Sequence, residues 1–389
     1  MSILRPYRTR ALLILTSIAT LASAQAETIT WNVQLKYGIT AAGIKNAIAD
    51  AKAHFTKAPN DQIVLEFGKG TYYLEDRSEQ EGIINLSHVK PGPEGRLIFK
   101  GQGMDKTTLV FSDDKHAIVG RQTYRVTMMG MHMTRKKYTV SQGHVVSVSP
   151  GKIILDIQPG FPTPLDIFNP DSSQGRYLRR YLDSKTDPQI IQQDNEQIPW
   201  QSARHIEGQR WQLTLKRKSQ TANYPVGSLI GIKSKHGGQT YWFMGGSDFI
   251  FDSVKWTHKT RGVFRGSFGN IQILNCVTDR APAIQGQVPC LASPGGGPQI
   301  GQPWDKPITG NIVRNCRFIG SGDDAVAFFH AEGSVTDCYI QDALARGILL
   351  SNSPKVVAEN NELVRCPIQR SKDHRLPGAP PLDQQKKKR

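Results

Sequence analysis

Two adjacent carboxylates, Asp323 and Asp324, are the densest candidate for chemistry in the sequence. Two like charges at contact distance favour a state in which one carboxyl holds a proton and the other is ionised, which suits acid–base catalysis near neutral pH. Neighbouring side chains of a regular strand point to opposite faces, so both can serve one site only if Gly320 and Gly322 bend the backbone. The alternative is a turn in which each aspartate caps its own backbone.

Residues one repeat away extend this candidate site. A step of 22 residues leads from Asp324 to Arg346 and from His330 to Asn352, and Arg261 falls on the same predicted ridge. Carboxylates transfer protons, and arginines bind hydroxyl or anionic groups through paired hydrogen bonds. We therefore predict catalytic roles for the two aspartates and substrate-binding roles for the other four residues. The alternative is a solvated ladder of charges, because the outer positions of any solenoid are polar.

The coil before the aspartates contributes two further expectations. The predicted ridge passes through the Pro282-Ala-Ile segment, and the glycine-rich segment Ser293–Gln299 is expected to be a flexible loop close to the site. This loop lacks the strand–helix context of a phosphate-binding loop, so we do not expect it to bind phosphate.

Three tryptophans, Trp242, Trp256 and Trp304, are candidates for sugar-stacking platforms. Their rings are large and amphipathic, which suits stacking on a sugar, but a solenoid also uses tryptophan in its core. Of the three, Trp304 is included among the predicted substrate-binding residues.

An internal repeat predicts the fold that positions these residues. Similar segments begin at Asp248, Asn270, Asn311, Ser334 and Lys355, with steps of 22, 41, 23 and 21 residues. Each segment alternates apolar and polar residues, ends in Asn, Asp or Ser, and precedes a second short strand. The alternation excludes helical solenoids. We predict an all-β protein that forms a right-handed parallel β-helix.

The cysteines support the same repeat. Three of them share one local frame, Asn275-Cys276, Asn315-Cys316 and Asp337-Cys338. This recurrence predicts stacked core positions rather than a disulfide framework. The five cysteines are odd in number, and their spacing matches no zinc site.

The N-terminus is typical of a cleavable export signal, because Arg5, Arg8 and Arg10 precede an apolar stretch and then the small residues Ala24 and Ala26. The apolar stretch is shorter than the roughly 18 residues of a membrane span. We predict a signal peptide over residues 1–26 and a periplasmic or secreted protein. A retained membrane anchor is the alternative.

Four further regions follow the signal. We predict an N-terminal cap and first coils over 27–140, an inserted small β-domain over 141–240, further coils with the site over 241–369, and a disordered basic tail over 370–389. A helix over residues 39–55 places Ile44, Ala47, Ile48 and Ala51 on one face and is expected to cap the solenoid.

The charge of the chain indicates its partners. The formal net charge is +16, and loss of the three signal arginines lowers it to +13. Such an excess attracts polyanions. Export favours an acidic polysaccharide or oligosaccharide over nucleic acid or an anionic membrane surface. The alternative is a solvated basic surface that binds no ligand. We expect a monomer without a membrane span and without a cofactor. No metal-ligand spacing is visible, although Asp323 and Asp324 are a possible Ca²⁺ site.

The motif around the aspartates resembles the β-helix glycoside hydrolases, and in particular the α-1,3-galactosidase family. The resemblance rests on Asn315-Cys316, Asp323-Asp324 and His330, on Arg346-Gly-Ile-Leu-Leu and on Glu359-Asn-Asn-Glu, and it covers residues 31–366. Polygalacturonases and other pectin-lyase-like proteins share the β-helix, and polygalacturonases also share a Gly-x-Asp-Asp element. The resemblance implies a capping helix, an inserted β-domain and cleavage of a glycosidic bond.

Two departures from that family keep other functions open. Residues 294–302 replace a segment in which an acidic partner is expected, and the family continues for many further coils. Our leading hypothesis is a glycoside hydrolase that uses Asp323 and Asp324. A polysaccharide lyase with Arg346 or His330 as the base is the second hypothesis. A non-catalytic glycan-binding or envelope protein is the third.

Overall fold

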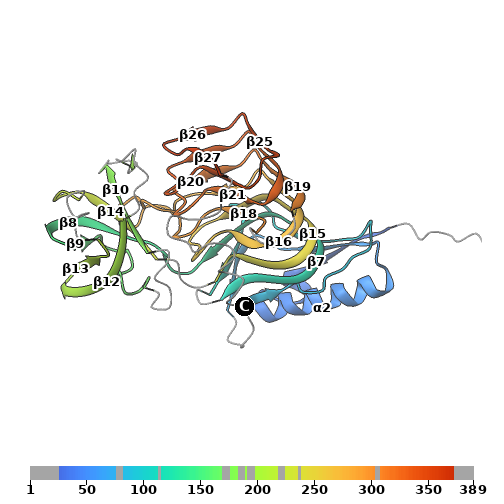
Figure 1. Ribbon diagram of the computed structural model, residues 1–389. Helices are drawn as coiled ribbons and strands as arrows, with labels where there is room; N and C mark the ends of the chain where they lie inside the picture. The colour runs from blue at the N-terminus through green and yellow to red at the C-terminus, as the bar shows by residue number, and fades with distance from the viewer. Residues whose placement is uncertain are drawn as a thin grey trace, which may run out of the picture.

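The computed structural model describes residues 26–75, 82–112, 115–168, 176–182, 189–190, 198–217, 224–234, 238–302 and 307–371. The expected signal segment, Trp304 and nearly all of the basic tail lie outside these residues. Figure 1 shows a solenoid of stacked coils with a smaller β-structure beside it. No helix in the ranges just given is long and apolar enough to cross a membrane.

Each coil of the solenoid contributes strands to three faces, and three long strands, β7 (His116–Arg135), β15 (Tyr241–Trp256) and β16 (Phe264–Leu274), pass around more than one face. The first face also contains β1 (Thr28–Asn32), β2 (Gln62–Glu66), β5 (Arg96–Lys100), β19 (Ile308–Arg314), β22 (Ala331–Thr336) and β25 (Val356–Glu359). The second face contains β3 (Gly70–Leu74), β6 (Thr107–Phe111), β17 (Val277–Thr278), β20 (Arg317–Ile319), β23 (Tyr339–Gln341) and β26 (Glu362–Val364). The third face contains β4 (Gly82–Asn85), β18 (Pro298–Ile300), β21 (Val326–Phe329), β24 (Ile348–Ser351) and β27 (Ile368–Ser371).

Neighbouring coils pair in parallel throughout, so the predicted parallel β-helix is confirmed. The predicted alignment of Asn270 with Asn311 is wrong by one residue, because Asn311 lies beside Ile271 after an irregularity in β19. The Asn311 side chain is fully buried and accepts from the Ile271 amide. It also donates to the carbonyl of Glu332. Asn311 therefore points into the solenoid and does not form a surface corner like Asn270.

The Asn-Cys frames form the corner between the first and second faces. Asn275 and Asn315 have φ angles of 56° and 53°, which asparagine tolerates better than most residues. Asn315 Nδ2 donates to Asn275 Oδ1 at 2.7 Å, which continues the stack along the surface. All five cysteines are buried free thiols, and Cys276 and Cys316 lie next to each other in the core. The prediction of stacked core cysteines is confirmed.

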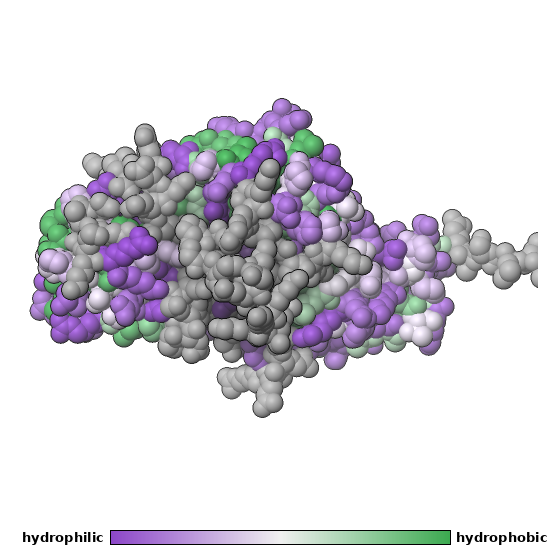
Figure 2. Space-filling view, viewed as in Figure 1, coloured by the Kyte–Doolittle hydropathy of each residue, from purple (hydrophilic) through white to green (hydrophobic). Residues whose placement is uncertain are grey.

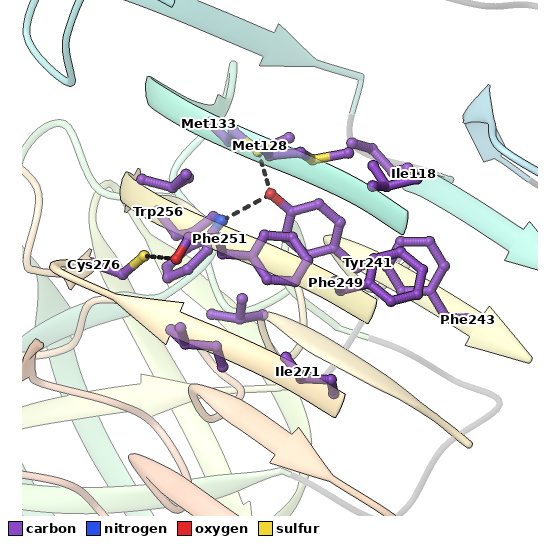
Figure 3. Packing of buried hydrophobic residues seen from close by; sticks show 14 of the residues in the cluster. Ile118, Met128, Met133, Tyr241, Phe243, Phe249, Phe251, Trp256, Ile271 and Cys276 are labelled. Carbon is purple, nitrogen blue, oxygen red and sulfur yellow. Dashed lines mark hydrogen bonds between the residues drawn. The ribbon is translucent and has the colours of Figure 1, made fainter. Parts of the chain in front are cut away.

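Aromatic side chains fill much of the solenoid interior (Figure 3). Trp256 is fully buried and donates through Nε1 to the hydroxyl oxygen of Tyr241 at 3.2 Å. Phe249 and Phe251 stack with their ring planes 6° apart. Trp256 is thus a core residue and not a sugar platform.

Figure 2 shows apolar residues gathered at the C-terminal end of the described part of the solenoid. Val357 and Ile368 in the last coil are 44% and 42% exposed.

The predicted N-terminal helix is present as α2 (Ala41–Lys57), after the short helix α1 (Val33–Lys36). Thr40 caps α2 by accepting a hydrogen bond from the Gly43 amide. The predicted apolar face, which includes Ile44 and Ala51, is buried in the same core as the strands. Figure 1 shows α2 at the end of the solenoid opposite to the last coil. Its role as a cap stays a prediction.

A second, antiparallel sheet lies between the two halves of the solenoid chain. Its strands are β8 (Ser141–Ser149), β9 (Lys152–Ile157), β10 (Tyr177–Leu182), β11 (Gln189–Ile190), β12 (Ile198–Glu207), β13 (Arg210–Leu215) and β14 (Leu229–Lys233). Because β10 pairs with both β12 and β14, the strands other than β11 close into a ring. A ring removes the exposed edges that an open sheet would have. The ring has its own buried core, which includes Trp200 and Leu213.

Close backbone contacts between coils depend on glycine at residues 295–297. A Cβ atom on Gly297 would lie 2.0 Å from the carbonyl oxygen of Ala325, well inside contact distance. Gly269 offers a matched comparison, because its Cβ would be 3.5 Å from the carbonyl oxygen of Thr309.

We predict that Gly297→Ala lowers the free energy of unfolding by roughly 1–3 kcal/mol or more, because the backbones must move apart. Gly269→Ala should change it much less. Thermal unfolding of both variants measures the difference, and equal midpoints would contradict the close packing of these coils.

One lysine is buried at the corner between the second and third faces. Lys259 is 1% exposed, and its amine donates to Thr278 Oγ1 at 3.4 Å. Burial lowers the pKa of this amine to about 7.

We predict that Lys259→Met stabilises the protein, by roughly 1–3 kcal/mol at neutral pH. Between about pH 7 and about pH 10.5, Lys259 is protonated in the unfolded chain but not in the folded chain. The free energy of unfolding of the wild type therefore rises with pH over this range. The gain from Lys259→Met should therefore be larger near pH 6.5 than near pH 10. A gain that does not change with pH would contradict the lowered pKa.

Candidate functional site

The two predicted aspartates lie in a turn at the corner between the second and third faces. The turn joins β20 to β21, and Gly320 adopts a φ of 65° where the chain bends. The Gly322 amide donates to the Gly295 carbonyl of the previous coil at 3.0 Å. The bend that the sequence required at these glycines is present.

Asp324 and Arg346 form a buried ion pair between consecutive coils. Arg346 donates through Nε to Asp324 Oδ1 and through Nη2 to Oδ2, the latter at 2.9 Å. The side chains are 4% and 17% exposed, respectively. The 22-residue step predicted that these two residues stack, and the structure shows this contact.

The pair favours the charged form of both partners. Burial by itself lowers the pKa of Arg346, but the hydrogen bond and charge of Asp324, with the charge of Asp323, outweigh burial and raise it. Both oxygens of Asp324 accept from one guanidinium, so this carboxylate is held in place as an anion.

Arg265 joins this group and was missed by the sequence reasoning. It lies on β16, and burial lowers the pKa of its guanidinium. The charge of Asp323 raises that pKa and the charge of Arg261 lowers it further, so the three charges lie within reach of one another. In the part of the chain that the structure describes, neither arginine forms a hydrogen bond or ion pair, and Arg261 Nε is buried without a partner.

The outward side of the third face continues the site. Trp242, Arg265 and Gln299 occupy neighbouring positions on β15, β16 and β18. Adjacent strands of this kind lie about 4.8 Å apart, which is close to the size of a sugar ring. Trp242 is half-buried, and its ring stacks on His116 with centroids 5.3 Å apart. Its role as a sugar platform stays a prediction.

The prediction that the segment before the aspartates is a flexible loop is wrong. Residues 292–298 are buried, and Gly295–Gly297 form the coil between Arg261 and Asp324. The predicted passage of the ridge through Pro282-Ala-Ile is also wrong. Residues 279–292 leave the coil, and Ile284 packs into the core of the inserted ring. An excursion of this length shifts any alignment based on a constant step.

The inserted ring packs directly against the turn that carries the aspartates. Lys233 Nζ donates to the Gly322 carbonyl, and Arg179 Nη2 donates to the Leu344 carbonyl. Both cations are almost fully buried, at 1% and 3% exposed. These contacts join segments 89 and 165 residues apart, and no local pattern in the sequence indicates them.

The structure does not bring His330 and Asn352 to the aspartates. They follow β21 and β24 at the opposite end of the third face, with φ angles of 51° and 48°. His330 lies six residue steps of extended chain after Asp324, a distance of about 20 Å. The two residues do stack on consecutive coils, because the His330 amide donates to the carbonyl of Ser351 at 3.0 Å.

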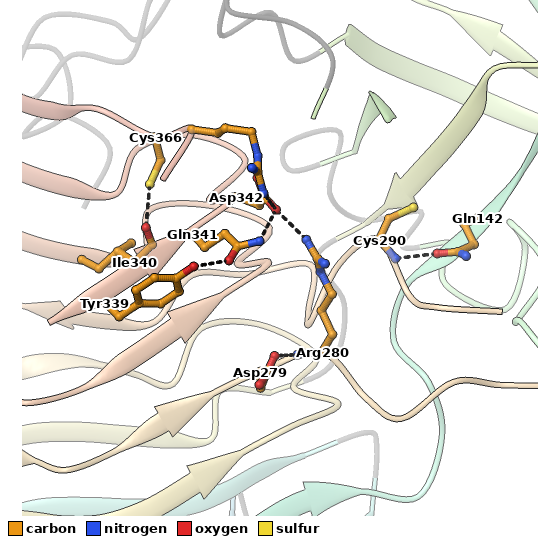
Figure 4. A network of polar contacts seen from close by, with 10 residues as sticks. Gln142, Asp279, Arg280, Cys290, Tyr339, Ile340, Gln341, Asp342 and Cys366 are labelled. Carbon is orange, nitrogen blue, oxygen red and sulfur yellow. Dashed lines mark hydrogen bonds and ion pairs between the residues drawn. The ribbon is translucent and has the colours of Figure 1, made fainter. Parts of the chain in front are cut away.

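A second buried carboxylate shows the same arrangement of aspartate and arginine (Figure 4). Asp342 is fully buried and accepts hydrogen bonds from Arg280, Gln341 and Arg365. Arg365 follows Asp342 by 23 residues, as Arg346 follows Asp324 by 22. Aspartate and arginine one coil apart therefore form a recurring structural contact in this solenoid.

Within the described ranges, no group of three or more His, Cys, Asp or Glu side chains is placed to hold one metal ion. Asp324 already has a guanidinium at both oxygens, which leaves Ca²⁺ a poorer partner for the Asp323–Asp324 pair.

No protein-family model matches the sequence, and no curated protein matches it. Among solved structures, the chain is similar to a provisionally assigned glycosyl hydrolase from Parabacteroides merdae, with 10% identity and a TM-score of 0.30 over 87% of this chain and 97% of the other. It is similar to an alginate lyase from Paenibacillus sp. with 9% identity and a TM-score of 0.30, over 90% and 98% of the chains. It is also similar to the A-module of a mannuronan C-5 epimerase from Azotobacter vinelandii, with 12% identity and a TM-score of 0.23, over 82% and 80%. All three names describe carbohydrate-active proteins, and identities this low leave the function to be inferred from the residues of this chain.

We predict that the Asp324–Arg346 pair is strongly coupled. Asp324→Leu or Arg346→Met alone leaves one charge buried without its partner, which should cost roughly 3–5 kcal/mol of stability. The double variant should lose much less than the sum of the single losses. Thermal or urea unfolding of the four proteins measures the coupling, and additive losses would contradict the pair.

Proposed function

We propose that this protein is a glycoside hydrolase that acts on an acidic glycan at the corner formed by Asp323, Asp324, Arg261, Arg265 and Arg346. The observation that carries the proposal is the pair of arginines, Arg261 and Arg265, which form no hydrogen bond or ion pair in the described chain, although the charge of Asp323 acts on Arg265. Guanidinium groups whose donors have no acceptor in the described residues are suited to bind an anionic group of a substrate.

Glycoside hydrolysis needs one carboxyl that exchanges a proton and one that is ionised. In our proposal Asp323 is ionised in the free protein, takes up a proton when the anionic group of the substrate neutralises Arg261 and Arg265, and gives that proton to the oxygen of the bond that breaks. Asp324, held ionised by Arg346, stabilises the positive charge that develops on the sugar. Water then adds to the anomeric carbon and gives its proton to Asp323, which restores the acid. Arg261 and Arg265 bind a carboxylate or sulfate group of the glycan.

The outward row of the third face provides the surface along which the chain would lie. Trp242 offers a ring for stacking and Gln299 offers an amide for hydroxyl groups. The net charge of +13 that remains after loss of the three signal arginines (16 − 3) favours approach of a polyanion. A periplasmic or secreted location and a monomeric state remain part of the proposal.

Glycan binding without cleavage is the second candidate. It is favoured by the burial of Asp324, whose oxygens both accept from Arg346 and whose side chain is only 4% exposed. The fully buried Asp342 shows that such pairs also serve the fold alone.

We predict that the protein releases reducing ends from an acidic glycan and that Asp323→Asn lowers the rate by about 100-fold or more, because proton transfer is lost. Asp337→Asn is the matched control, since Asp337 is an exposed corner residue at a φ of 58° where asparagine also occurs. Reducing-end assays on a panel of neutral and acidic glycans measure both variants.

Three results would test the proposal. Equal rates for Asp323→Asn and the wild type would contradict the role of Asp323. Binding of acidic glycans without product would favour the second candidate. Arg265→Ala should raise KM for acidic glycans and leave KM for neutral ones unchanged.

A further inference from the structure

The inserted ring places a buried cation at the turn that carries the two aspartates. Lys233 is the last residue of β14 and is 1% exposed. Its ammonium donates to the carbonyl oxygen of Gly322, the residue directly before Asp323. This contact joins the ring to the solenoid and belongs to neither sheet.

Gly322 is held through both of its backbone polar groups. Its amide donates to the Gly295 carbonyl of the previous coil at 3.0 Å, and its carbonyl accepts from Lys233. A Cβ atom on Gly322 would clash with the carbonyl oxygen of Ser293, so the turn lies directly against that coil. The peptide unit between Gly322 and Asp323 is planar, and fixing its carbonyl oxygen therefore fixes the direction in which the chain enters Asp323.

Lys233 takes its own position from the inserted ring. Its main-chain carbonyl accepts from Trp200 Nε1 at 3.1 Å. Its amine lies 5.2 Å from the centre of the Tyr177 ring, and Tyr177 is its direct neighbour on β10. An ammonium over an aromatic ring gains a cation–π attraction, which helps to keep this buried charge in place.

The ring is also fastened to the next coil at the same corner. Arg179 donates to the carbonyl of Leu344, two residues before Arg346. A small apolar cluster continues this contact, and its members are Val140, Tyr181, Leu229, Cys290, Leu291 and Leu344. The ring thus contacts the coil that carries the aspartates through Lys233 and the coil that carries Arg346 through Arg179.

We infer that Lys233 is a positioning residue for Asp323, which makes the inserted ring a working part of the hydrolase corner. This inference rests on the proposed function, in which Asp323 transfers a proton. Such a transfer needs the carboxyl within hydrogen-bond reach of the glycosidic oxygen, so a small rotation of the turn lowers the rate. Lys233 acts through the Gly322–Asp323 peptide unit and needs no contact with the sugar.

Arg176 provides a matched control within the same ring. It is 6% exposed, donates to the carbonyl of Gln201 at 2.6 Å, and has its guanidinium carbon 4.7 Å from the centre of the Phe168 ring. Its surroundings therefore resemble those of Lys233, but these contacts lie within the inserted part of the chain. Arg176→Met removes a buried cation from the ring without removing the contact to Gly322.

Kinetics of the full-length variants on an acidic glycan test the inference. Lys233→Met should lower kcat by about 10- to 100-fold, because Asp323 is displaced. KM should stay nearly unchanged, since Arg261 and Arg265 are intact. Arg176→Met should leave kcat and KM as in the wild type, and unfolding midpoints compare the stability of the variants. A kcat loss in Lys233→Met no larger than that in Arg176→Met would overturn the inference.

Amide hydrogen exchange tests the same contact without any activity. Exchange across residues 320–325 should become about 10-fold faster in Lys233→Met, because the turn loses a hydrogen bond from a charged donor. It should not change in Arg176→Met, and equal exchange in the two variants would overturn the inference. A wild type that releases no product would contradict the proposed hydrolase, and the exchange result alone would then decide whether Lys233 holds the turn. Lys233→Gln, which is shorter and neutral, takes the place of Lys233→Met in both assays if that variant does not fold.

Discussion

Parallel pairing between coils at a nearly constant step is the constraint on which this structure depends. The main-chain hydrogen bonds of each coil fix which residues of the next coil lie above it, as Val326 lies below Ile348 and Thr336 beside Glu359. Side chains separated by about 22 residues are therefore neighbours, and polar residues at the corners form stacks without any contact that is local in sequence. The same pairing leaves the outward side chains of each face in straight rows, which is a geometry suited to a chain-like ligand.

The stacked aspartate–arginine contact is used in two environments. Around Asp342 it is surrounded by Arg280, Gln341 and Arg365 and is fully buried, so it stabilises the fold where the coils meet the inserted ring. Around Asp324 the same contact lies at the edge of the third face, next to arginines that lack partners in the described chain. The difference between the two pairs is that Arg261 and Arg265, beside the second one, form no hydrogen bond or ion pair in the described chain. Those unused donors are the physical basis for assigning function to one corner and structure to the other.

The sequence predicted the fold and part of the site because both follow from the repeat. The cysteine frames and the step from Asp324 to Arg346 depend only on residues one coil apart, and the structure shows both contacts. Arg265 could not be connected to the aspartates in this way. Residues 279–292 interrupt the coil after it, so the step that aligns Arg265 with Gln299 is 34 residues (299 − 265). Predictions from a constant step fail at such interruptions, and cation sites assembled across them are seen only in three dimensions.

A crystal structure of the Asp323→Asn variant with an acidic oligosaccharide would test the central claim most directly. Our account predicts that the sugar lies along the outward row of the third face, with its ring on Trp242 and an anionic group within hydrogen-bond distance of Arg261 and Arg265. An oligosaccharide bound elsewhere, with both arginines untouched, would contradict the assignment of this corner as the hydrolase site.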